Sequence, residues 1–335
     1  MNETFVVPPE RAGLELDEFL CLHFPGCPKG VLRQVIREGR VLVDGTSARP
    51  SQRLRPDQVL LVDLDEADLP EGPGAPECEL AILHEEEDWM AVDKPAGIAV
   101  EPERWERSRA TIAGALLRVA KDRSKEGDGL ATRLRLVHRL DKETSGVLVV
   151  AKDLAAERFL RGAFEERVLH KEYLALVEGE HPLPEGEWDE IDLPIGADPR
   201  KSGRMVVDEH AGKPSLTRIA VERRFRGYTL LRCEPRTGRT HQIRVHLAAV
   251  GFPLAVDRLY GRRNELHLSQ LKLRYKPKPG RPERPLIDRL TLHSACIAVP
   301  RPSHPEAPPV PIRSPLPRDL SQVLKQLGKV RAWAD

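Results

Sequence analysis

The residues best suited to chemistry lie together in the stretch VHRLDKETSG, residues 137–146. It places His138, Arg139 and Asp141 in a charged turn directly ahead of an apolar, strand-like run. A charged turn next to a strand is how a rigid scaffold presents a side chain at a cleft. Because Arg139 and Lys142 flank Asp141, its carboxylate is expected to stay ionised, and an ionised, partly desolvated carboxylate can act as a nucleophile or a base. The alternative is a turn or capping aspartate held by local hydrogen bonds.

A second polar stretch, RTGRTHQIRVHL at residues 236–247, concentrates arginine and histidine in a turn and a helix start. Thr240 is the expected N-cap of that helix. The arginine-rich loop at 236–244 could close over Asp141 and keep it charged. Isolated histidines at this spacing favour structural hydrogen bonds over a metal site.

The elements around these stretches are many short strands with occasional helices and no alternation of strand and helix. This pattern predicts an α+β domain with a largely antiparallel sheet. A length of 335 residues suggests about two domains. We expect a small N-terminal module at 11–64, an acidic linker rich in Pro and Gly at 65–80, a catalytic domain at 81–300, and a Pro-rich extension with a short helix at 301–335.

The composition indicates neither a membrane protein nor a protein held together by disulfides. The formal net charge is +1, so the total charge indicates no partner, and the five cysteines form no CxxC pair. Reduced thiols are the simpler interpretation of such cysteines. The N-terminus has no signal-peptide pattern, and no run of about 18 apolar residues occurs. We therefore expect a soluble cytoplasmic protein, and nothing in the sequence calls for more than a monomer.

Local charge singles out the N-terminal module. Between Lys29 and Arg55 there are seven basic and two acidic residues. Arg33, Arg37 and Arg40 have the spacing of one helix face. An ordinary solvated face is one interpretation. The order of two helices, EGRVLVDG and a strand also resembles the S-four-type RNA-binding module, which implies that this face docks on structured RNA.

Three ordered motifs resemble the signatures of the RluA-type RNA pseudouridine synthases. They are HRLDKETSGVLVVAKD, KEYLAL and RTGRTHQIRVHL, with DKPAG before them and LHSACIAVPRP after them. The resemblance implies the pseudouridine synthase fold with a largely antiparallel mixed sheet, and isomerisation of uridine in RNA without a cofactor or metal. Ribosomal RNA is the first expected substrate, and transfer RNA is the second.

The resemblance also implies roles for single residues. Asp141 matches the essential aspartate that drives cleavage of the glycosidic bond, Tyr173 the active-site tyrosine that packs against the base, and Arg244 the basic partner of the aspartate. Arg139 matches an arginine associated with RNA contact and displacement of the target base, which must leave its stack to be reached. Further candidates for RNA contact in these motifs are His138, Arg239, Thr240, His241 and Gln242.

The chain departs from the family pattern at AVDRLYG, where the family commonly has Gly-Asp-Pro-Leu-Tyr-Gly; Val256 and Arg258 are the differences. These changes could alter substrate choice. The basic, Pro-rich segment 272–285 is either a further RNA contact or a solvated loop, and its charge favours the former.

Two rival functions remain. A glycoside hydrolase would need two carboxylates across its substrate, and the motifs offer only Asp141 and its close neighbour Glu143. A non-catalytic RNA-binding or ribosome-assembly factor could retain the same fold, although the presence of Asp141, Tyr173 and Arg244 argues against it. The aromatic content of 4% argues against binding of single strands by base stacking.

Overall fold

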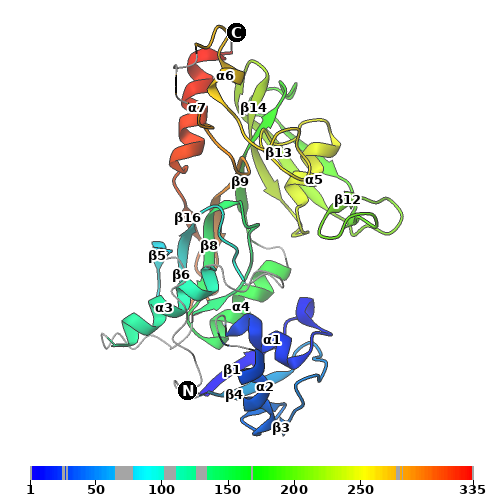
Figure 1. Ribbon diagram of the computed structural model, residues 1–335, viewed down its shortest axis with the longest axis vertical. Helices are drawn as coiled ribbons and strands as arrows, with labels where there is room; N and C mark the ends of the chain where they lie inside the picture. The colour runs from blue at the N-terminus through cyan, green and yellow to red at the C-terminus, as the bar shows by residue number, and fades with distance from the viewer. Residues whose placement is uncertain are drawn as a thin grey trace. The chain divides into compact units, whose positions relative to one another are not determined.

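The computed structural model describes residues 2–24, 27, 29–64, 78–101, 111–125, 134–166, 169–276, 280 and 282–333. It divides into two compact units (Figure 1). The first unit contains residues 1–80, 98–136 and 151–157, and the second contains 81–97, 137–150 and 158–335. Most of the predicted linker, residues 65–77, lies outside the described residues.

The first unit contains a four-stranded antiparallel sheet in the order β1-β4-β2-β3. Two helices, α1 (Leu16–His23) and α2 (Lys29–Arg37), pack their apolar faces into one core with it. A short 3-10 helix (Pro9–Arg11), the helix α3 (Ile112–Lys125) and the strand β7 (Arg135–Leu136) complete the unit. The four strands are β1 (Asn2–Val6), β2 (Val41–Val43), β3 (Thr46–Ser47) and β4 (Val59–Asp63).

The second unit is organised around a long mixed sheet in the order β10-β13-β14-β9-β15-β8-β6-β5. Of its pairs with a defined register, only β8 with β15 is parallel. This largely antiparallel α+β arrangement confirms the predicted fold class. The strands are β5 (Ala81–Glu85), β6 (Trp89–Lys94), β8 (Ser145–Ala151), β9 (Lys171–Glu178), β10 (Trp188–Asp192), β13 (Leu216–Phe225), β14 (Tyr228–Pro235) and β15 (Leu292–Val299), with β16 (Val310–Arg313) paired to β15.

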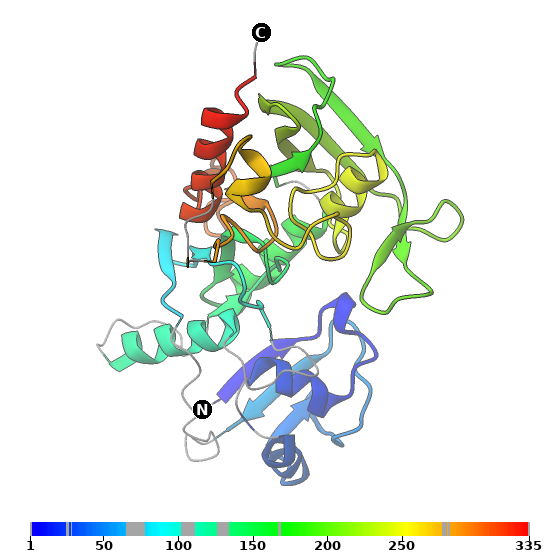
Figure 2. The ribbon, with the colours of Figure 1, turned by 45° about the horizontal axis from the view of Figure 1, so that its top comes forward.

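Helices cover this sheet and a hairpin projects from it. The helix α4 (Leu154–Glu165) follows β8 in the chain. The helix α7 (Arg318–Val330) buries Leu320, Val323 and Leu327 in a core shared with α6 (Leu268–Leu271) and the start of β14. The helix α5 (Gln242–Ala249) packs Ile243 and Leu247 against strands β9, β13 and β14. The small hairpin of β11 (Ile195–Ala197) and β12 (Met205–Val207) extends away from the sheet (Figure 2).

One row across the sheet joins three strands, two of which lie unusually close together. Ser294 of β15 is paired with Gly146 of β8 on one side and with Tyr173 of β9 on the other. A Cβ atom at Gly146 would lie 2.1 Å from the Ser294 carbonyl oxygen, and Gly146 has φ +117°. Only glycine combines that backbone conformation with that approach. The row therefore places the start of β8 and Tyr173 of β9 on opposite sides of the same residue of β15.

No helix among the described residues is long and apolar enough to cross a membrane.

Candidate active site

Asp141 lies in a turn that ends at the start of β8. The Thr144 N–H donates to the Asp141 carbonyl oxygen at 3.0 Å, which closes the turn. Lys94, at the end of β6, is fully buried beneath the turn. Its Nζ donates to the carbonyl oxygens of Pro95 (2.9 Å), Lys142 (2.9 Å) and Thr144 (2.7 Å). A buried ammonium group on three carbonyl oxygens fixes the backbone on both sides of the turn.

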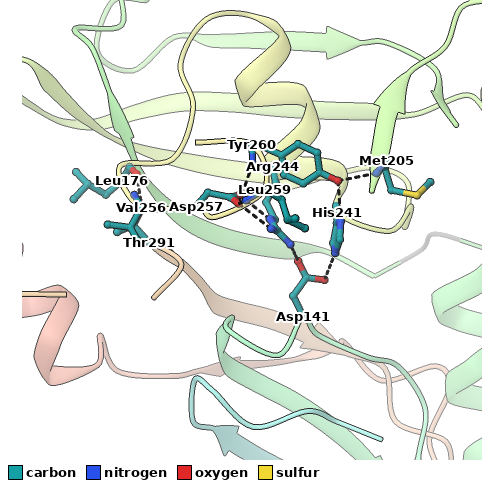
Figure 3. A network of polar contacts seen from close by, with 10 residues as sticks. All are labelled: Asp141, Leu176, Met205, His241, Arg244, Val256, Asp257, Leu259, Tyr260 and Thr291. Atoms are coloured by element: carbon teal, nitrogen blue, oxygen red, sulfur yellow. Dashed lines mark hydrogen bonds and ion pairs between the residues drawn. The ribbon is translucent and has the colours of Figure 1, made fainter. Parts of the chain in front are cut away.

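Arg244, on α5, joins Asp141 to a second carboxylate, Asp257 (Figure 3). Its Nη1 donates to Asp141 Oδ2 at 2.8 Å. Its Nε and Nη2 donate to the two oxygens of Asp257 at 2.8 and 2.9 Å. Burial alone would lower the pKa of Arg244, but the two carboxylates outweigh it and the pKa is raised. The guanidinium therefore stays charged and held in one plane.

Asp257 is itself fixed by the loop that follows it. Its side chain is fully buried, and its Oδ1 accepts the N–H groups of Leu259 (2.8 Å) and Tyr260 (3.2 Å). The Tyr260 ring lies 5.0 Å from the Arg244 guanidinium carbon, within cation–π range. Asp257 is therefore a buried partner of Arg244, whereas 23% of the Asp141 side chain is exposed.

His241 lies on the other side of the Asp141 carboxylate. Its Nε2 is 3.9 Å from Asp141 Oδ1, and its Nδ1 is 2.9 Å from Tyr260 Oη. Burial lowers the pKa of His241, more than the nearby Asp141 raises it. The expected Thr240 N-cap is wrong, because α5 begins after His241, which has a left-handed backbone (φ 57°, ψ 19°) and makes no side-chain cap bond.

Tyr173 lies on β9, across from Ser294. Burial is the main reason that the pKa of Tyr173 is raised, to about 12; its hydrogen bond with Ser294 lowers the pKa and the charge of Asp141 raises it. A phenol with that pKa keeps its proton at neutral pH. The Tyr173 hydroxyl can therefore donate a hydrogen bond or a proton but is a poor base.

The other candidates from the motifs occupy different surroundings. Arg139 is exposed two residues before Asp141, and Thr240 is exposed in the loop before α5. His138 stacks on Phe164 and its Nε2 accepts the Val149 N–H at 2.9 Å. Arg239 is partly buried and its Nε donates weakly to the Pro214 carbonyl at 3.4 Å.

Gln242 is buried and all of its side-chain hydrogen-bonding groups have protein partners. Its oxygen accepts from Thr237 (2.6 Å) and from the Arg239 N–H (3.0 Å). Its nitrogen donates to the Leu216 carbonyl and to Thr217 Oγ1, both at 3.0 Å. These contacts shape the loop before α5, and they leave the amide no group for a ligand.

The three arginines predicted to share one helix face differ in their surroundings, and the prediction is wrong for Arg40, which lies beyond the end of α2 at Arg37. Arg33 pairs with the fully buried carboxylate of Asp17 at 2.6 Å, and Lys29 Nζ lies 3.1 Å from the same carboxylate. Arg40 is partly buried, with Nη1 3.7 Å from Glu38. Arg37 is exposed at the end of α2. Arg37 is therefore the member of this face whose charge is most accessible.

Three residues of the site were not among the sequence candidates: Lys94, Asp257 and Tyr260. Each lies in a stretch that the family motifs include or adjoin. Lys94 belongs to DKPAG, and Asp257 and Tyr260 are the two polar positions at which AVDRLYG keeps the family residue. The sequence signal for all three is that these positions keep the residue of the family pattern.

The arrangement can perform acid–base and nucleophilic chemistry on a polar substrate. It offers a partly exposed carboxylate held by a buried guanidinium, a protonated phenol and a neutral imidazole. Among the described residues there is no group of three or more His, Cys, Asp or Glu side chains that could hold a metal ion.

Comparison with known proteins identifies the family. Residues 88–249 match the family model described as RNA pseudouridylate synthase, and residues 16–60 match the S4 domain. An uncharacterized RNA pseudouridine synthase of Aquifex aeolicus is 39% identical over 73% of this chain and 76% of its own length. The ribosomal large subunit pseudouridine synthase D of Nitrosomonas europaea is 34% identical over 96% of this chain and 86% of its own.

Among solved structures, the human RNA pseudouridylate synthase domain containing 4 has the same fold. Its TM-score is 0.54 at 24% identity, over 74% of this chain and 92% of that one. The chain belongs to the RluA-type family of RNA pseudouridine synthases, isomerases that act on RNA, and it has an N-terminal S4 domain.

Proposed function

We propose that this enzyme converts specific uridines of large-subunit ribosomal RNA to pseudouridine, with Asp141 as the catalytic residue. The observation that supports Asp141 is that Arg244 binds two carboxylates and donates to only one oxygen of Asp141, Oδ2. The other oxygen, Oδ1, is then available to the substrate. A carboxylate that is ionised, oriented and partly exposed suits attack on the sugar or removal of a proton from it.

The reaction is an isomerisation whose atoms balance without a co-reactant. The bond between the ribose and ring nitrogen one of uracil breaks, and Asp141 drives that cleavage. The detached uracil turns, and the ribose joins ring carbon five. That carbon loses its proton and nitrogen one gains a proton. Tyr173 packs against the base, and its retained proton makes its hydroxyl a donor in this step.

The target base must leave its stack to reach Asp141, which costs a few kcal/mol. We propose that Arg139, exposed two residues from Asp141, occupies the space that the base leaves. The planar guanidinium of arginine stacks on bases and contacts phosphates, so it suits that role.

Large-subunit ribosomal RNA is supported as the substrate by the name of the Nitrosomonas europaea relative, which aligns over 96% of this chain. We propose that the exposed face of α2, with Arg37 at its end, and the basic segment 272–285 bind phosphates of that RNA. The described residues of this segment include the exposed Lys272, Arg274 and Lys276; residues 277–279 and 281 lie outside the described residues. Such contacts fix position on RNA rather than sequence.

The test is tritium release from large-subunit ribosomal RNA transcribed in vitro with uridine tritiated at ring carbon five. Wild-type protein should release tritium, and Asp141→Asn, which keeps the size of the side chain, should release none above background. Equal release by both proteins would remove Asp141 from the mechanism. Release from transfer RNA but not from ribosomal RNA would overturn the proposed target, and binding of RNA without any release would favour a non-catalytic binding factor.

A further inference from the structure

His241, the residue before helix α5, has a backbone conformation that is unusual for that position. Residues before a helix usually have an extended backbone and use their side chain to cap an N–H group. His241 is instead left-handed, with φ 57° and ψ 19°, and it caps nothing. Non-glycine residues are rare in this region, and they gather at functional sites, where surrounding contacts hold them in place. The side chain of His241 makes its contacts with Tyr260 and Asp141 instead.

The contacts of Tyr260 favour one of the two neutral tautomers of His241. Tyr260 Oη accepts the Met205 N–H at 2.8 Å, because a backbone N–H can only donate. Its own proton is then free to be donated to His241 Nδ1, 2.9 Å away. An Nδ1 that accepts a hydrogen bond leaves the proton of the neutral ring on Nε2. This tautomer points an N–H, rather than a lone pair, at the negative charge of Asp141.

We infer that His241 is a positioning residue for Asp141, held by Tyr260 as the tautomer whose Nε2–H donates to Asp141 Oδ1 when substrate is bound. This inference rests on the proposed role of Asp141. Arg244 already holds Oδ2 at 2.8 Å, so a donor on Oδ1 fixes the plane of the carboxylate. The gap of 3.9 Å is too long for a hydrogen bond and closes when the nucleotide excludes water, as hydrogen bonds in empty active sites commonly do. Oδ1 keeps its second lone pair for the reaction.

The same chain of contacts connects Asp141 to the hairpin of β11 and β12, because Met205 begins β12. Arg204, next to Met205, has its guanidinium carbon 5.6 Å from the Tyr260 ring centroid. The first residue of β12 is thereby linked through the Tyr260 hydroxyl to the His241 ring (Figure 3).

The first test observes the tautomer directly in the whole protein labelled with ¹⁵N-histidine. The His241 signals are identified by their loss in His241→Gln. We expect Nε2 to be protonated and Nδ1 to accept a hydrogen bond in the wild type, and we expect Tyr260→Phe to produce a mixture of tautomers. The matched control is Tyr228→Phe, since the Tyr228 hydroxyl accepts from Arg263 and has no contact with His241. A wild-type ring protonated on Nδ1 would overturn the inference.

The second test measures single-turnover tritium release from the same ribosomal RNA transcript. His241→Leu, which removes the donor, should slow the chemical step by about tenfold with little change in RNA affinity. His241→Gln carries an N–H at a similar reach and should recover most of the rate. A loss of affinity with an unchanged rate would make His241 a substrate-binding residue instead. If wild type and His241→Leu are equally active, His241 has no positioning role and the proposed function stands. If wild type is inactive although His241 has the expected tautomer, the proposed function is wrong.

Discussion

Arg244 is bound by two carboxylates of unequal exposure: Asp257, which is fully buried, and Asp141, whose side chain is 23% exposed. Asp257 takes two donors of the guanidinium and Asp141 takes one. The charge of Arg244 is thus balanced by a residue that substrate does not reach, and Asp141 need not supply the whole counter-charge. A carboxylate neutralised by only one donor keeps more of its reactivity than one that is bound bidentately.

Asp257→Asn should therefore weaken both the fold and the site. The substitution leaves the buried guanidinium of Arg244 with one carboxylate instead of two. Removing one partner of a buried ion pair costs about 3–5 kcal/mol, and because the asparagine amide keeps the size of the side chain, the loss should lie at the lower end of that range. We expect a large loss of unfolding free energy in urea and a parallel loss of tritium release. The double variant Asp257→Asn/Arg244→Met should be more stable than the sum of the single variants predicts; strict additivity would show that the pair is not coupled.

Lys94→Met should destabilise the turn that contains Asp141. The methionine fills similar space but leaves three carbonyl oxygens without the ammonium group, and the one in the fully buried contact, of Thr144, should cost about 1–3 kcal/mol if left unsatisfied. Urea denaturation should show the loss of stability, and tritium release should fall because Asp141 is no longer held in place. Lys325→Met, on the exposed face of α7, is the matched control and should change neither quantity. A variant as stable as wild type would contradict the role of Lys94.

The second unit should lose stability as the pH is lowered, because His138 is buried in its neutral form. Burial lowers the pKa of His138 to about 3, from an ordinary value of 6.5. Between these two pH values the unfolded chain binds a proton that the folded chain does not, so the stability contributed by the neutral ring is present above pH 6.5 and is lost as the pH falls toward 3. At pH 5 this amounts to about 2 kcal/mol.

His138→Gln removes the titration and keeps an acceptor for the Val149 N–H. Its unfolding free energy should change less than that of wild type between pH 7 and about pH 5, where carboxylates contribute little. Parallel curves for the two proteins would show that His138 takes up its proton equally in the folded and the unfolded chain, contrary to the lowered pKa.

Gly146→Ala should prevent the sheet from closing at β15. The added methyl group would meet the Ser294 carbonyl oxygen at 2.1 Å, in a backbone conformation that alanine rarely adopts. We expect little folded protein, or a thermal midpoint lowered by more than about 10 °C, since such clashes cost several kcal/mol and about 1 kcal/mol lowers the midpoint by a few degrees. Gly162→Ala, inside α4 with open space around it, should be neutral or slightly stabilising.

Arg37→Ala should reduce the dependence of RNA affinity on salt. Removal of a single interaction with a phosphate lowers the slope of log affinity against log salt by about 0.7–0.9. Arg37 is a cleaner choice than Arg33, because Arg33→Ala also removes a partner of the buried Asp17. Arg318→Ala, exposed at the start of α7, should leave the slope unchanged. An unchanged slope in Arg37→Ala would show that this helix face does not bind phosphates.

The sequence predicted the parts of the fold whose signal is local. Alternating apolar residues and turns were enough to predict a largely antiparallel α+β domain, and the motif order was enough to predict the family. The strand β1 has too short and polar a sequence, NETFV, to be recognised alone, and it forms because β4 offers a partner 53 to 61 residues later.

The contacts inside the site depend on residues far apart in the chain, which no local pattern reports. Lys94 meets the Thr144 carbonyl across 50 residues, and Arg244 meets Asp141 across 103. The expected cap at Thr240 failed for a related reason. Local preference favours threonine there, but the contacts of His241 with Tyr260 and Asp141 move the helix start by one residue and hold a conformation that the local sequence disfavours.

The close row through Gly146, Ser294 and Tyr173 also fixes the order in which the enzyme can become active during its synthesis. The turn with Asp141 and the strand with Tyr173 leave the ribosome early, but β15, which lies between β8 and β9, is made more than 100 residues later. The first sheet, β1 to β4, needs nothing beyond residue 63 to pair. The RNA-binding module can therefore fold while the chain is still growing, and catalytic competence arrives only near the end of translation.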